Sequence, residues 1–99
     1  SYGALLNGHA ERGDAEGAAE WFERMERSAV VPTVIQYNQL FKACARARPP
    51  RMASAEELFR RLVGTRQLAP TRITLKLLGR CLGGRRLAEL CAELGVDQS

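Results

Sequence analysis

Two stretches of the sequence, SYGALLNGHAERGD (residues 1–14) and QYNQLFKACARARP (residues 36–49), follow one pattern. Each has a tyrosine followed by a small or polar residue, Gly3 or Asn38, then an apolar pair, and then a helix-breaking residue, Gly13 or Pro49. The second stretch follows the first after about one repeat length of the kind found in arrays of helix pairs. We therefore expect one unit to be copied along the chain.

The spacing of apolar residues predicts an all-α chain, because no segment of the sequence has a strand pattern. Three helix pairs are expected, at 2–12 with 15–27, at 34–47 with 52–63, and from 72 to a Gly83-Gly84 turn with a short helix after it. Gly13 is expected to end the first helix in a left-handed conformation, and Asp14 to cap the second. Ser54 and Glu57 could form a capping box for the fourth helix, which could equally start at Pro50.

The units match at both helices and at both turns. The matched positions are Tyr2 with Tyr37, Leu5 with Leu40, Ala18 with Ala55, Phe22 with Phe59, Met25 with Leu62, and Pro32-Thr33 with Pro70-Thr71. Amphipathic helices alone would reproduce the apolar matches but not the paired Pro-Thr endings. The repeat is therefore a property of the sequence, and the matched apolar residues are the expected core.

Composition and charge limit the class of protein. With 45% hydrophobic and 26% charged residues the chain is of ordinary globular composition, and no apolar run approaches the roughly 20 residues of a membrane span. Because the chain starts inside a patterned segment, we expect it to be part of a longer protein. Its three widely spaced cysteines predict buried free thiols in a reducing compartment. The net charge of +4 combines an acidic first unit with a second unit of seven basic and two acidic residues, which permits a polyanionic partner.

The repeat has a period of about 35 residues. Its units combine Tyr-Asn-x-Leu opening one helix (37–40), a glycine turn (Gly13), Ala-x-x-x-Phe-x-x-Met on the next helix (18–25) and a closing Pro-Thr. This combination resembles the pentatricopeptide repeat family. The tetratricopeptide repeat is of similar length, but its Trp and Leu-Gly signature in the first helix is missing. The resemblance covers a repeat at 1–33, a second with small insertions at 34–71, and a degenerate, shortened third at 72–99. It implies an α-solenoid of helix-turn-helix repeats that forms a right-handed superhelix.

In that family the first helices line a groove for single-stranded RNA, and each repeat reads one base with two or three side chains. The resemblance implies base reading by Gly3 with Thr33, by Asn38 with Thr71 and by Lys76, and base stacking by Ile35 and Ile73. Gly3 has no side chain to read with, and Lys76 lies outside the family's usual code. Thr closes two repeats where the family has Asp, Asn or Ser. Asn38 is the residue that matches a reader, with a pyrimidine preference implied by the resemblance alone.

Helical geometry places a polar stripe beside Asn38. Steps of four residues lead from Asn38 to Lys42 and Arg46, on a face away from the expected core. The corresponding stripes are Lys76 and Arg80 in the third unit, and Gly3, Asn7 and Glu11 in the first. Lys42, Arg46 and Arg80 are candidate phosphate contacts, which position a strand without reading it. For each of them the alternative is an ordinary solvated surface charge.

The sequence points to no catalytic, metal or cofactor site. His9 has no second ligand at metal spacing, and a single His completes no nucleophile–base set. The Gly83-Gly84-Arg85-Arg86 turn lacks the Lys-Ser/Thr of a phosphate-binding loop. Trp21 is expected to pack in the core rather than to serve a protein partner.

Two functions from different classes remain. The leading hypothesis, implied by the resemblance, is binding of single-stranded RNA in a mitochondrion or chloroplast, without enzyme activity. The alternative is a scaffold subunit that holds proteins within a large organellar complex, such as a ribosome or a photosynthetic assembly. The basic stripe and Asn38 favour RNA, whereas the acidic first unit and the incomplete set of readers favour the scaffold.

Overall fold

The computed structural model describes residues 2–98 apart from the side chain of Tyr2, so the expected match of Tyr2 with Tyr37 lies outside the described residues. Within that range the chain forms six α-helices and no strand. They are α1 (Tyr2–Glu11), α2 (Ala15–Arg27), α3 (Val34–Arg46), α4 (Met52–Gly64), α5 (Arg72–Leu82) and α6 (Gly84–Leu94). The all-α fold and its expected helix pairs are confirmed.

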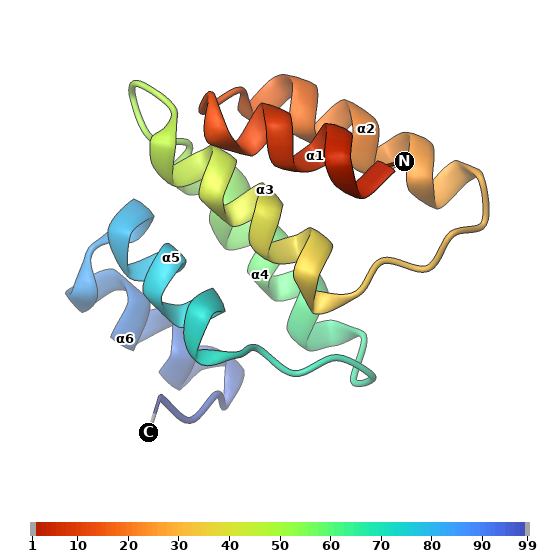
Figure 1. Ribbon diagram of the computed structural model, residues 1–99. Coiled ribbons are helices and arrows are strands. Elements are labelled where there is room, and N and C mark those ends of the chain that lie inside the picture. The colour runs from red at the N-terminus through yellow and green to blue at the C-terminus, as the bar shows by residue number, and fades with distance from the viewer. Residues whose placement is uncertain (1, 99) are drawn as a thin grey trace.

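The helices form two layers. α1, α3 and α5 lie side by side in one layer, and α2, α4 and α6 lie behind them (Figure 1). The molecule measures 34 × 31 × 19 Å, and its shortest dimension equals about two helix diameters. This arrangement of helical hairpins leaves one face of the first helices open. None of the helices in the described part of the chain has the length and apolar character needed to cross a bilayer.

A single core joins the layers through the central helix α3, which contacts α1, α2, α4 and α5. Tyr37 of α3 packs edge-on against Phe22 of α2, with ring centroids 5.1 Å apart. Phe41, also on α3, packs edge-on against Phe59 of α4 at 6.4 Å. The first of these contacts joins the first helix pair to the second, and the other holds α3 against α4 within the second pair. Trp21 is partly buried against the same core, as expected.

The expected core of α1 needs one correction. Leu6 and Ala10 are fully buried, whereas Leu5 is 42% exposed. Its counterpart Leu40 is only 2% exposed. The difference arises because α1 packs against α2 and α3 alone, while α3 has a first helix on each side.

Side chains fix the starts of several helices. Asp14 caps α2 by accepting a hydrogen bond from the Gly17 backbone N–H at 3.0 Å, and Gly13 before it has a φ of +69°, both as predicted. α4 begins at Met52, as the sequence predicts, and its N-cap residue Arg51 makes no side-chain capping bond. Neither the capping box of Ser54 and Glu57 nor the alternative start at Pro50 is found, because Ser54 already lies inside the first turn of the helix.

Each second helix is followed by one residue with a left-handed backbone. These residues are Ala29 after α2 (φ 60°), Arg66 after α4 (φ 58°) and Gly95 after α6 (φ 71°). Glycine adopts this conformation without steric strain, whereas a residue with a Cβ is destabilised there. The three second helices thus end with the same left-handed conformation. Only after α6 is the residue a glycine, which adopts this conformation without strain.

Candidate nucleic-acid interface

Asn38 lies on α3 beside the start of α5. Its Oδ1 accepts a hydrogen bond from the Thr74 hydroxyl at 2.6 Å, and its Nδ2 donates to Thr71 Oγ1 at 3.5 Å. Thr74 is fully buried, and its hydroxyl is 3.1 Å from that of Thr71. Because a threonine hydroxyl has one hydrogen, Thr74 donates to Asn38 and Thr71 donates to Thr74. The network fixes the carboxamide of Asn38 and, within the described residues, uses one of its two N–H donors.

Two exposed isoleucines flank Asn38. Ile35 of α3 is 61% exposed and Ile73 of α5 is 62% exposed. Both line, together with Asn38, a cavity of about 340 Å³ on the face of the first helices. Its other lining residues are Asn7, Gln39, Lys42 and Leu77. A fixed carboxamide between two aliphatic side chains can receive a flat ring on its edge while the ring's faces meet the isoleucines.

Gly3 and Thr33 do not form a comparable arrangement. The Thr33 hydroxyl and backbone N–H both donate to Gln36 Oε1, at 2.6 and 2.8 Å. Gly3 faces open space, since no neighbouring atom lies within 4 Å of where a Cβ would stand. Gln39 donates to the Gly3 carbonyl at 3.4 Å, but its own Oε1 is buried with no hydrogen-bond partner in the part of the chain described. The α1–α3 junction therefore has the scaffold of the α3–α5 junction without its polar network.

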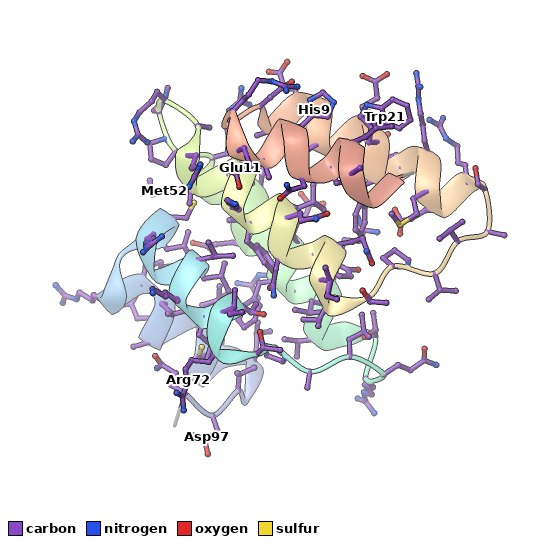
Figure 2. The ribbon with its side chains drawn as sticks, in the orientation of Figure 1. His9, Glu11, Trp21, Met52, Arg72 and Asp97 are labelled. Carbon is purple, nitrogen blue, oxygen red and sulfur yellow. The ribbon has the colours of Figure 1, made fainter. Side chains whose placement is uncertain are left out.

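Lys76 is exposed on α5 and does not line the cavity beside Asn38. It lines another hollow, of about 590 Å³, together with Thr71, Arg72 and, from the C-terminal segment, Asp97. Figure 2 shows Arg72 and Asp97 at the same end of the molecule. The carboxylate of Asp97 offsets part of the positive charge of Lys76 and Arg72 in this hollow.

Lys42 and Arg46 both contact Glu11, the last residue of α1. Lys42 Nζ pairs with Glu11 Oε1, and Arg46 Nη1 pairs with Oε2 at 2.9 Å. Arg46 Nη1 also donates to the Glu11 backbone carbonyl at 3.1 Å. The hydrogen bond and charge of Lys42, followed by those of Arg46, hold the pKa of Glu11 below its ordinary value, so the carboxylate is ionised at neutral pH. Two of the three predicted phosphate contacts thus hold an internal anion.

Most of the basic surplus of residues 34–71 is used inside the molecule. Three ion pairs join residues one repeat length apart: Glu11–Arg46 at 2.9 Å, Glu16–Arg51 at 2.9 Å and Glu26–Arg61 at 2.8 Å. Arg60 pairs in the other direction, with Glu93 at 2.9 Å. With Lys42, five of the seven basic residues in this segment have a carboxylate partner. Most basic residues of this segment therefore pair with carboxylates of neighbouring units. The net charge of the segment overstates the positive charge that a polyanion would meet.

Arg80, the third predicted phosphate contact, is exposed on α5. It lines a cavity of about 310 Å³ between α3 and α5, together with Lys42, Arg46 and Arg48. The Arg48 guanidinium donates to the backbone carbonyls of residues 45–47 at 3.3–3.4 Å. Glu11 offsets part of the charge of Lys42 and Arg46. The four cations still leave this cavity with a positive potential, which favours an anionic ligand.

Sequence reasoning missed the capping partners Gln36 and Thr74, and it missed the ion pairs of Glu11 with α3. Gln36 and Thr74 each lie three residues after a capping threonine, which is the spacing of a capping box, so the sequence did contain a signal for them. Glu11 lay on the predicted stripe of the first helix. Its pairing with α3 depends on which helices are neighbours, and helical periodicity does not reveal that.

The described residues contain no group of three side chains that could hold a metal ion. His9 Nδ1 lies 2.9 Å from Asp14 Oδ2, at the turn between α1 and α2. All three cysteines are free and buried, as expected. Burial raises the pKa of Cys44 to about 11, so this thiol is protonated at neutral pH and a poor nucleophile.

Comparison with known proteins gives one positive finding on the family. A family model described as the PPR repeat family matches residues 1–46. These residues include α1, α2 and α3, and therefore both Gly3 and Asn38. No curated protein and no solved structure matches the chain.

Proposed function

Through residues 1–46 the chain belongs to the pentatricopeptide repeat family, and we propose that it is a module that binds single-stranded RNA along the face of α1, α3 and α5. Proteins of this family are in general helical-repeat proteins that bind RNA, and they are commonly organellar. We propose three repeat units at 1–33, 34–71 and 72–99, a location in a mitochondrion or chloroplast, and a role in binding rather than catalysis.

The observation that carries the proposal is the cavity in which Asn38 lies between Ile35 and Ile73. A base that enters between the two isoleucines meets the Nδ2 donor of Asn38, whose orientation Thr74 fixes. Uracil and cytosine both carry an O2 carbonyl that accepts such a hydrogen bond, so this contact is compatible with the pyrimidine preference that the family resemblance implies. Arg80, exposed on the same layer of helices, supplies a candidate phosphate contact.

The test is titration of the protein with short oligouridine and oligoadenine strands, read by fluorescence anisotropy at several salt concentrations. Wild-type protein is expected to bind oligouridine with an affinity that falls as salt rises, because phosphate contacts release counterions. Asn38→Ala is expected to weaken oligouridine binding about tenfold and to reduce the preference over oligoadenine, since it removes the base contact.

Asn7→Ala is the matched control. It removes a carboxamide from the wall of the same cavity, but one that does not bond to the Thr71–Thr74 pair. It should change both affinities little and equally. Thermal unfolding of both variants checks that the fold is kept. If wild-type protein binds neither strand, or if Asn38→Ala binds like Asn7→Ala, the proposed function is wrong.

One observation favours a scaffold subunit of a large organellar complex as a second candidate. The ion pairs between units neutralise most of the basic residues of the second unit, whereas Val30 and Val31 are 44% and 78% exposed on the connection before α3. Exposed apolar residues of this kind suit a protein surface. This candidate predicts salt-independent association with protein subunits and no RNA binding.

A further inference from the structure

The two carboxylate oxygens of Glu11 each form an ion pair with a cation on the face of α1, α3 and α5, which is the candidate RNA-binding face. Oε1 takes Lys42 Nζ and Oε2 takes Arg46 Nη1 at 2.9 Å. Lys42 and Arg46 are one helical turn apart on α3, so both point to the same side. Figure 2 shows the Glu11 side chain at the end of α1, beside α3. A carboxylate held by two cations occupies the position that a phosphate would take between them.

The same two cations also line the cavity of about 310 Å³ that includes Arg48 and Arg80. Lys42 and Arg46 therefore have Glu11 on the α1 side and this cavity on the α5 side. Arg46 and Glu11 are each 48% exposed, so solvent and added ions reach the pair. Exposed ion pairs contribute little to stability, and an incoming anion can exchange with the carboxylate.

Two other ion pairs show what is particular to Glu11. Glu16 pairs with Arg51 at 2.9 Å and Glu26 pairs with Arg61 at 2.8 Å, at the same separation along the chain. Neither Arg51 nor Arg61 lines a cavity of the first-helix face. Pairing between units is thus a general feature of the fold, whereas at Glu11 the cations belong to the candidate RNA site.

We propose that Glu11 is an internal competitor of the RNA phosphate at Lys42 and Arg46, and that it sets the affinity and the salt dependence of this face. The inference rests on the proposed function. Glu11 lowers the affinity in two ways: its charge repels the polyanion, and RNA must displace it to reach both cations. With Glu11 in place, the phosphate contacts shift toward Arg80.

The experiment compares Glu11→Gln with Glu16→Gln, which changes the net charge equally but lies on α2. Both variants and the wild type are titrated with oligouridine over a series of salt concentrations. Glu11→Gln is expected to bind roughly threefold to tenfold more tightly at low salt, from the removal of one nearby charge. The slope of log affinity against log salt should steepen by about 0.7 for each additional phosphate that the protein neutralises. Glu16→Gln should match the wild type.

A second variant separates competition from a structural role. Lys42→Gln should weaken binding more in the Glu11→Gln background than in the wild type, because only there is Lys42 free for phosphate. If the wild type binds and Glu11→Gln binds no more tightly than Glu16→Gln, the inference is wrong and the proposed function stands. Weaker binding by Glu11→Gln would mean that Glu11 positions the cations, which also overturns it. If neither the wild type nor Glu11→Gln binds RNA, both proposals fail.

Discussion

The junction between α1 and α3 and the junction between α3 and α5 use the same scaffold for different purposes. At both junctions the later helix, α3 or α5, begins with a capping box whose N-cap residue is a threonine. At α3–α5, Asn38 joins that cap through Thr74, while at α1–α3 the corresponding position is Gly3 and faces open space. The cations also differ, because Glu11 neutralises Lys42 and Arg46 from the α1 side. The difference teaches that the fold and the candidate site depend on separate residues.

Gly13 tests the scaffold of the first junction and should have the largest effect. Its φ is +69°, and a Cβ there would lie 2.7 Å from the backbone oxygen of Arg46. Gly13→Ala therefore combines a left-handed backbone with a clash against the end of α3, and we expect it to lower the free energy of unfolding by about 2 kcal/mol or more. Urea denaturation followed by circular dichroism measures the change.

Gly3→Ala is the control for that experiment. Gly3 lies within α1 and has nothing near its Cβ position, so alanine should be neutral or stabilise slightly. A Gly13→Ala variant as stable as Gly3→Ala would show that the packing of Gly13 on α3 does not hold the two helices together.

The sequence predicted the scaffold because its signals are local. The left-handed Gly13 and the cap at Asp14 were both recognised from residue type and position, and both are confirmed. Apolar spacing predicted the burial of Phe22 and Phe59 in the same way. The error at Leu5 shows the limit of such signals. Periodicity defines an apolar side of a helix, whereas burial depends on whether another helix covers that side.

The candidate site was less predictable because it depends on contacts between helices. Asn38 was identified by resemblance, but its bond to Thr74 spans 36 residues and needs α5 in place. Lys42 and Arg46 were interpreted as free cations, since nothing in the sequence places Glu11 against them. Contacts of this kind follow from the packing of one unit on the next, which residue spacing within a unit does not describe.

Gly3→Asn would make the α1–α3 junction more similar to the α3–α5 junction. We expect it to have an intermediate effect, on RNA affinity. It places a carboxamide at the position that corresponds to Asn38, into space that is already open. The capping threonine of this junction is Thr33, whose hydroxyl donates to Gln36 Oε1. We expect roughly threefold to tenfold tighter binding to an oligouridine long enough to reach both junctions, from one added base contact.

Gly3→Ala again serves as the control and should leave the RNA affinity unchanged. Tighter binding by Gly3→Asn to a short strand, which spans only the α3–α5 junction, would contradict the interpretation. The added base contact would then lie outside the row of base sites along the first helices.

The connections after α2, α4 and α6 give the smallest effect and compare the units without touching the groove. Ala29 and Arg66 adopt the left-handed backbone that Gly95 adopts after α6. Ala29→Gly and Arg66→Gly should each stabilise by about 0.5–1 kcal/mol, since relief of a strain of roughly 1–2 kcal/mol exceeds the entropy that glycine adds to the unfolded chain. Gly95→Ala should destabilise by a similar amount. Equilibrium denaturation measures all three, and RNA affinity should stay the same because none of them lines the cavities beside Asn38 or Arg80. Loss of stability in Ala29→Gly would mean that the connection before α3 is held by contacts of the Ala29 side chain. The end of α2 would then be stabilised in a different way from the end of α6, where the left-handed residue is a glycine.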